Sequence, residues 1–235
     1  MWPFKEKPTC WWPDSGDFIV DDLGDYIDLH QETVIHQIKS IMPLHFFNQA
    51  FICGGFAANV VGITNSYDDV DIFVTDRTEF MLTVDYLQRH HDICVMYHTN
   101  SKDDYGERFK FIYKTSVIDL VDYSKVIDKR RQAEIRLGKF DSVYIKILKT
   151  FDINWSMACI DVGANVEQWH KVIYHEDALS PTVAMNEGRR ITNNYHIAER
   201  INKYQSRLSF APNLKWNDAI AKKLMSDEKG SPSIY

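Results

Sequence analysis

The chain has 235 residues, 45% of them hydrophobic, and is therefore long enough to bury a substantial core. Its four cysteines are widely spaced and form no Cys-x-x-Cys pair, which argues against a zinc ribbon or a disulfide framework and favours a reducing compartment. The sequence has no apolar run of membrane-spanning length and no signal-peptide core, so we expect a cytoplasmic protein without a membrane partner.

The net charge of −6 is unevenly distributed along the chain. Residues 1–110 contain 8 Lys and Arg against 18 Asp and Glu, whereas residues 111–235 contain 19 against 15. The acidic first half disfavours a long nucleic acid as partner, because such binding draws on an extended basic surface. The basic second half restores that possibility, and it also offers the positive charge that a bound triphosphate needs.

The first 42 residues predict an arm followed by a helix. Residues 1–27 contain three tryptophans among prolines and acids, which indicates an irregular arm with the capacity to contact a protein partner. From Asp28 the apolar residues recur with helical spacing, and Pro43 marks the end of that helix.

A buried strand is predicted at residues 50–53, and it ends at Gly54 and Gly55. Paired glycines let the backbone approach a ligand closely. The helix expected from Ala57 to Val61 would turn free N–H groups toward a phosphate, with Asn59 as a weaker candidate for a nucleotide contact.

Two acids, Asp69 and Asp71, alternate along the next predicted strand. They share one face of the strand, while Val70, Ile72 and Val74 bury the other. Neighbouring carboxylates oppose folding unless a cation lies between them, and Mg²⁺ prefers oxygen ligands. The pair therefore predicts a site for Mg²⁺ or Mn²⁺.

A helical pattern from Thr78 to His90 precedes three strand-like runs, at Ile93–His98, Arg108–Tyr113 and Val117–Val121. These elements predict an α+β fold in which helices flank a central mixed β-sheet. The last run carries Asp119 between apolar neighbours. Asp122 would face the other way in a regular strand, so only one of the two can join the cluster, and we select Asp119.

The order strand, Gly-Gly, short helix, D-x-D strand and later acid resembles the polymerase-beta-like nucleotidyltransferase superfamily over residues 45–125. The resemblance implies the nucleotidyltransferase fold and transfer of a nucleoside monophosphate from an NTP, such as ATP, to an acceptor hydroxyl with release of pyrophosphate. It implies that the catalytic, metal-binding residues are Asp69, Asp71 and Asp119. Gly54 and Gly55 would bind the β- and γ-phosphates.

Two later segments resemble the CCA-adding and bacterial poly(A) polymerase branch of that superfamily. FDINWSMACID, residues 151–161, is similar to a segment that follows the catalytic strands, and ERINKYQSRLSF, residues 199–210, is similar to a basic helix. This similarity implies nucleotide contacts for Arg200, Lys203 and Arg207. In that branch an R-R-D run before the first segment contacts the nucleotide sugar. Leu148, Lys149 and Thr150 stand at the corresponding positions here, so only Lys149 keeps a positive charge and a nucleotide contact is implied for it.

We expect an arm at 1–27, a catalytic domain at 28–165, and a mostly helical portion at 166–235 packed on that domain. No E-D-x-x-R neck motif follows the basic helix, so we do not expect CCA addition itself. An RNA 3′ end, a protein and a small molecule stay open as acceptors. The alternative is a catalytically silent nucleotidyltransferase-like module that binds a protein, a reading supported by Phe56 where relatives carry a small residue.

Overall fold

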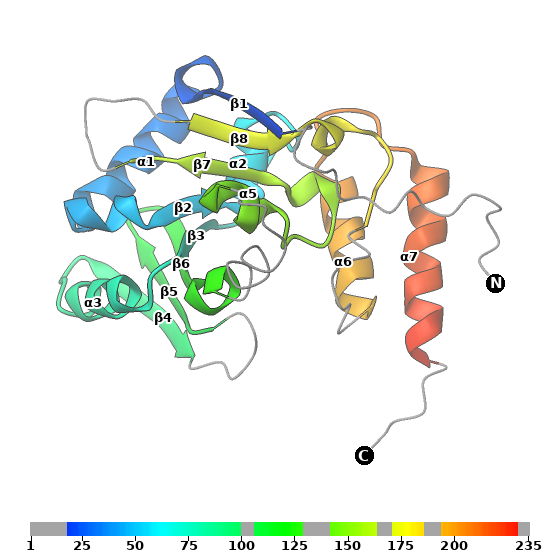
Figure 1. The fold of residues 1–235 in the computed structure, drawn as a ribbon. Coiled ribbons are helices and arrows are strands. Elements are labelled where there is room, and N and C mark those ends of the chain that lie inside the picture. Colours follow the sequence, from blue (N-terminus) through cyan, green and yellow to red (C-terminus); the bar gives the residue numbers. More distant parts are fainter. Residues whose placement is uncertain (1–17, 100–105, 129–141, 164–170, 186–193, 230–235) are drawn as a thin grey trace.

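The computed structural model describes residues 18–99, 106–128, 142–163, 171–185 and 194–229. Its centre is a mixed sheet of eight strands in the order β1-β8-β7-β2-β3-β6-β5-β4 (Figure 1). The strands are β1 Phe18–Asp22, β2 Ala50–Cys53, β3 Val70–Val74, β4 Ile93–Thr99, β5 Arg108–Tyr113, β6 Ser116–Asp122, β7 Ala158–Asp161 and β8 Lys171–His175. Strands β3 and β6 are parallel, and the other neighbouring pairs are antiparallel. The predicted α+β fold with a central mixed sheet is confirmed.

One face of the sheet carries the main core, beneath α1 Leu29–Ile41, α2 Gly54–Val60 and α3 Arg77–Gln88. The alternation of β3 produces this face, because Val70, Ile72 and Val74 are fully buried there. Helix α1 begins at a capping box in which Asp28 and Gln31 each accept a hydrogen bond from the other's backbone N–H. It ends at Ile41, before Pro43, as predicted.

The opposite face is only partly covered. Helix α5, Val143–Leu148, packs there on a smaller cluster that includes Phe73, Val121 and Tyr123. Phe73 and Asp71 lie on the same side of β3, so the apolar cluster continues directly into the predicted acidic site.

Helices α6 Asn194–Gln205 and α7 Leu214–Lys229 pack side by side at one end of the sheet (Figure 1). Helix α6 ends at Gln205, so the helix predicted to continue to 210 is shorter than expected. The chain turns there because Leu208 forms an isolated bridge with Thr64 in the loop after α2. None of the helices among the described residues combines the length and the apolar character needed to cross a membrane.

Two edge segments differ from the predicted organisation. Residues 18–22, expected in an irregular arm, form β1 because their backbone pairs with β8. Strand β8 in turn lies beyond the expected boundary at residue 165, yet it pairs with β7 in the central sheet. The tryptophans of the predicted arm lie outside the described residues, and the division into domains stays a prediction. Short 3-10 helices complete the fold at Leu23–Asp25, Leu44–Asn48, Asn154–Ser156 and Glu176–Leu179.

Candidate active site

Three carboxylates meet on the partly covered face of the sheet. Asp71 and Asp119 are direct register partners on the parallel strands β3 and β6, so their side chains project from the same face. Asp69 lies two residues before Asp71, at the entrance to β3. One carboxylate oxygen from each residue lies within 4.8 Å of the other two. The structure thus brings together the three predicted acids, whose catalytic role stays a prediction.

Asp122 belongs to a different ion-pair network. Its carboxylate accepts a hydrogen bond from Arg77 at 2.8 Å and others from the backbone and hydroxyl of Ser124. Arg77 also pairs with the buried Glu107. Of the two candidates for the third carboxylate, only Asp119 lies with Asp69 and Asp71.

Gly54 allows the backbone to pass close to this cluster. Its φ of +68° lies in the left-handed region, and a Cβ added there would overlap Oδ2 of Asp71. Helix α2 starts at Gly54, three residues earlier than predicted, because the two glycines form its first turn. Gly55 has no such constraint, since its Cβ would meet Tyr67 at an ordinary 3.6 Å.

The electrostatics of the carboxylates suit a divalent cation. Burial, together with the charges of Asp69 and Asp119, raises the pKa of Asp71 to about 7. Asp119 is fully buried, and its Oδ1 has no hydrogen-bond partner among the described residues. A compact set of three carboxylates with one unsatisfied buried oxygen is the oxygen-rich donor set that Mg²⁺ or Mn²⁺ prefers.

Two cations on β5, which the sequence reasoning did not identify, contact the same carboxylates. Arg108 Nη2 lies 2.5 Å from Asp119 Oδ2 and 3.8 Å from Asp71 Oδ1. Lys110 Nζ lies 2.5 Å from Asp69 Oδ2 and 3.8 Å from Asp119 Oδ2. Every carboxylate of the cluster therefore has a cationic nitrogen within 3.8 Å.

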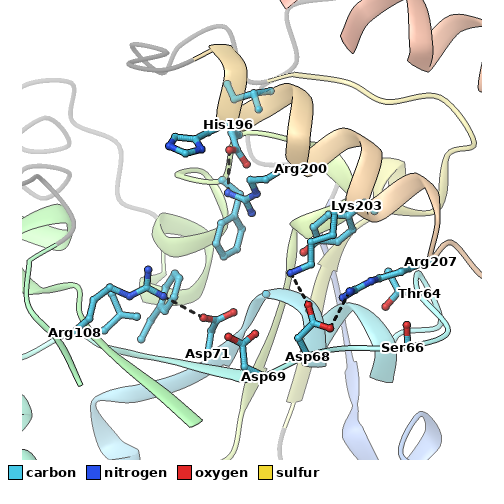
Figure 2. A pocket seen from close by; sticks show the side chains of 18 of the residues that line it. Thr64, Ser66, Asp68, Asp69, Asp71, Arg108, His196, Arg200, Lys203 and Arg207 are labelled. Carbon is cyan, nitrogen blue, oxygen red and sulfur yellow. Dashed lines mark hydrogen bonds and ion pairs between the residues drawn. The ribbon is translucent and has the colours of Figure 1, made fainter. Parts of the chain in front are cut away.

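A cavity of about 550 Å³ opens over two of the three acids. Predicted residues that line it are Gly54, Gly55, Asp69, Asp71, Arg200, Lys203 and Arg207. The basic residues approach from α6 and the turn after it, whereas Arg108 approaches from the opposite side (Figure 2). Aromatic side chains of Phe73, Tyr123 and Phe151 form an apolar part of the wall.

The basic residues above the cavity are themselves paired with acids. Lys203 and Arg207 contact Asp68 at 2.9 and 2.8 Å (Figure 2), and they lower the pKa of Asp68 to about 2. Arg200 contacts Asp152 at 2.9 Å. The sequence reasoning missed both acids, although Asp68 directly precedes the D-x-D pair and Asp152 lies within the FDINW segment.

Two predicted nucleotide contacts lie away from this cavity. Asn59 donates a hydrogen bond to the carbonyl of Thr64 and accepts one from Gln31, so it connects α1 to the loop after α2 and lines a second cavity. Lys149 is the C-terminal cap residue of α5 and is not among the residues that line the cavity over the acids.

No protein-family model matches the sequence, and no curated protein matches it either. Solved structures do match the fold. A CCA-adding enzyme in complex with CTP gives a TM-score of 0.56 at 14% identity, over 89% of this chain and 47% of that one. An apo form of a CCA-adding enzyme gives 0.55 at 15% identity, over 91% and 48%. The Thermotoga maritima CCA-adding enzyme complexed with tRNA gives 0.52 at 14% identity, over 89% and 46%.

The chain spans about half the length of these structures. Low identity combined with coverage of nearly the whole chain means that the likeness lies in the arrangement of the elements. The chain shares the arrangement of its helices and strands with these CCA-adding enzymes, which confirms the predicted nucleotidyltransferase-like fold.

Proposed function

We propose that the chain is a metal-dependent nucleotidyltransferase, which transfers a nucleoside monophosphate from an NTP to an acceptor hydroxyl and releases pyrophosphate. One observation carries the proposal: Asp69, Asp71 and Asp119 converge beside Gly54. Two of these acids line a cavity whose other side carries three basic residues. Carboxylates that could bind a cation and basic side chains that could bind phosphates thus line the same cavity.

The three carboxylates would hold Mg²⁺ or Mn²⁺. A divalent ion bound there would lower the pKa of an attacking hydroxyl and offset negative charge that develops on the reacting phosphate. The raised pKa of Asp71 supports this assignment, because a carboxylate that is costly to ionise in the free protein gains most from a bound cation.

In the proposed reaction the acceptor oxygen forms a bond to the α-phosphorus. The bond from the α-phosphorus to the oxygen shared with the β-phosphate breaks, pyrophosphate leaves with that electron pair, and the hydroxyl proton passes to solvent. Gly54 and Gly55 would approach the β- and γ-phosphates with their backbone N–H groups, and at Gly54 only glycine fits beside Asp71. Arg200, Lys203 and Arg207 would offset the charge of the leaving pyrophosphate.

The acceptor hydroxyl could belong to an RNA 3′ end, a protein or a small molecule. The similar solved structures include complexes with CTP, ATP and tRNA, so nucleotides and RNA 3′ ends are the first substrates to test. A protein or small-molecule hydroxyl stays open, because the same nucleophile occurs in all three classes.

The test is incubation with each of the four α-labelled NTPs, Mg²⁺ or Mn²⁺, and total RNA or a cell lysate, followed by separation of the labelled products. We expect labelling that falls by about three orders of magnitude or more in Asp71→Ala and in Asp119→Asn, because the carboxylates act as a unit. Asp85→Asn is the matched control, since Asp85 lies on the outer side of α3 and pairs only with Arg89 among the described ion pairs. Equal labelling by the wild type and Asp71→Ala would refute the proposal.

The second candidate is a silent nucleotidyltransferase-like module that binds a protein. The observation that favours it is the pairing of the acids with Arg108 and Lys110, which neutralises them without a metal. Calorimetry with Mg²⁺ and a non-hydrolysable NTP separates the two, because only the enzyme should show nucleotide binding that depends on the metal.

A further inference from the structure

Arg108 and Lys110 are fixed on the acidic face of the sheet by the alternation of β5. The residues between and after them, Phe109 and Phe111, are fully buried in the main core on the other face. A turn of the cations to that face would require a slip of the register by one residue and would expose the phenylalanines. The fold therefore keeps both cations on the face of the sheet that carries the carboxylates.

The register also sets which acid each cation contacts. Lys110 lies directly opposite Asp119, which in turn lies opposite Asp71, so the three residues form one row across β5, β6 and β3. Arg108 lies opposite Val121, one step along the same face, and reaches back to Asp119. The contacts are a consequence of strand pairing, with each cation able to reach two carboxylates.

These cations use oxygen atoms that the proposed metal ion would need. Lys110 binds Oδ2 of Asp69 and Arg108 binds Oδ2 of Asp119, both at 2.5 Å. A dication coordinated by the same carboxylates would lie beside two like charges in a partly buried site, where repulsion is poorly screened. The ion pairs and a bound metal ion therefore compete.

We propose that Arg108 and Lys110 are built-in counter-ions, which stabilise the metal-free carboxylate cluster and must move away when a divalent ion binds. This inference rests on the proposed function. The movement is feasible because the Arg108 side chain is 41% exposed and lines the cavity, and because the Lys110 side chain retains 18% exposure at the end of a flexible stem. The metal affinity of the wild type is thus lower than the three carboxylates alone would give.

The experiment measures the binding of Mn²⁺ alone, by electron paramagnetic resonance of the free ion, so that the readout is independent of turnover. We expect Lys110→Gln to bind Mn²⁺ about tenfold more tightly than the wild type or better, because one positive charge near the carboxylates is removed. Arg108→Gln carries the same expectation and is the second variant should Lys110→Gln fail to fold. Lys110→Arg keeps the charge and should keep an affinity near that of the wild type.

Lys215→Gln is the matched control, because Lys215 is exposed on α7 and lines neither cavity, so its loss should leave Mn²⁺ affinity unchanged. Unchanged or weaker Mn²⁺ binding in folded Lys110→Gln and Arg108→Gln overturns the inference while leaving the proposed enzyme intact. Binding of Mn²⁺ by the variants but not by the wild type supports the inference. No binding of Mn²⁺ by any of these proteins overturns the inference, and the labelling assay then decides on the proposed enzyme separately.

Discussion

Replacement of Gly54 by alanine tests whether the glycine corner and the carboxylate cluster form one structure. Gly54 has a φ of +68°, and an added Cβ would overlap Oδ2 of Asp71 and lie 3.3 Å from its Cγ. A residue with a Cβ in left-handed backbone conformation costs about 1–3 kcal/mol, so we expect the free energy of unfolding to fall by that amount. The Asp71 carboxylate must also turn away, and we expect Mn²⁺ affinity to fall about 10- to 100-fold.

The adjacent glycine provides a control with the same chemical change. At Gly55 a Cβ would lie 3.6 Å from Tyr67, an ordinary contact, and no left-handed φ is required. Because alanine is favoured over glycine in a helix by up to about 1 kcal/mol, Gly55→Ala should be as stable as the wild type or slightly more stable. Its Mn²⁺ affinity should equal that of the wild type, because the added methyl group would not contact Asp71.

The stability of the two variants is compared by urea unfolding, with circular dichroism as the probe. Their Mn²⁺ affinity is compared by titration of the folded proteins. Equal stability of Gly54→Ala and Gly55→Ala would refute the backbone argument. A destabilised Gly54→Ala protein with unchanged Mn²⁺ affinity would refute the link between the glycine corner and Asp71, even if the strain is real.

Two further predictions concern ion pairs outside the carboxylate cluster. Arg77→Met should lower the free energy of unfolding by about 3 kcal/mol, because the buried carboxylates of Asp122 and Glu107 lose their shared cation, yet it should leave Mn²⁺ affinity unchanged. Urea unfolding and Mn²⁺ titration check both parts, and a large loss of Mn²⁺ binding would contradict the separation of Asp122 from the site. The pKa of Asp68 is lowered from 3.8 to about 2, so its ion pairs should stabilise the fold above pH 4 and lose that effect as the pH falls through 2. The stability difference between the wild type and Asp68→Asn, no more than about 1 kcal/mol for this exposed group, should therefore shrink between pH 5 and pH 2, and a constant difference would contradict the assignment.

Local periodicity was sufficient to predict the elements that carry the acids. The alternation around Asp69 and Asp71 predicted a strand with one buried face, and β3 has that face. The same rule placed Asp119 and Asp122 on opposite faces of their strand, and the structure gives them separate partners. Such predictions need only the period of a strand, which each segment carries in its own sequence.

Strand pairing and contacts between segments that are distant in the sequence could not be predicted from local periodicity. The run RFKFIY predicted a strand, but nothing within it shows that β5 lies next to β6, where Arg108 and Lys110 contact the acids. The short β1 was predicted as irregular because its strand character depends on pairing with β8, more than 140 residues later. Arg207 was predicted on a helix, whereas the bridge between Thr64 and Leu208 ends the helical path before it.

The charges around the candidate site are balanced before any ligand binds. Within the part of the chain that the structure describes, five carboxylates and five cations take part in its ion pairs, namely Asp68, Asp69, Asp71, Asp119 and Asp152 with Arg108, Lys110, Arg200, Lys203 and Arg207. Every described Lys and Arg that lines the cavity is already paired with a carboxylate, so each would have to exchange a carboxylate for a phosphate oxygen to bind a triphosphate. A metal ion would require the reciprocal exchange at the acids, which would release Arg108 and Lys110. In the proposed enzyme, a nucleotide and a divalent ion that bind together would exchange these partners. The phosphates would pair with the released cations and the carboxylates would hold the ion, so every charge would keep a partner. Either ligand alone would leave charges in a partly buried site without partners, so for the proposed enzyme we expect joint binding of metal and nucleotide to be tighter than binding of either one.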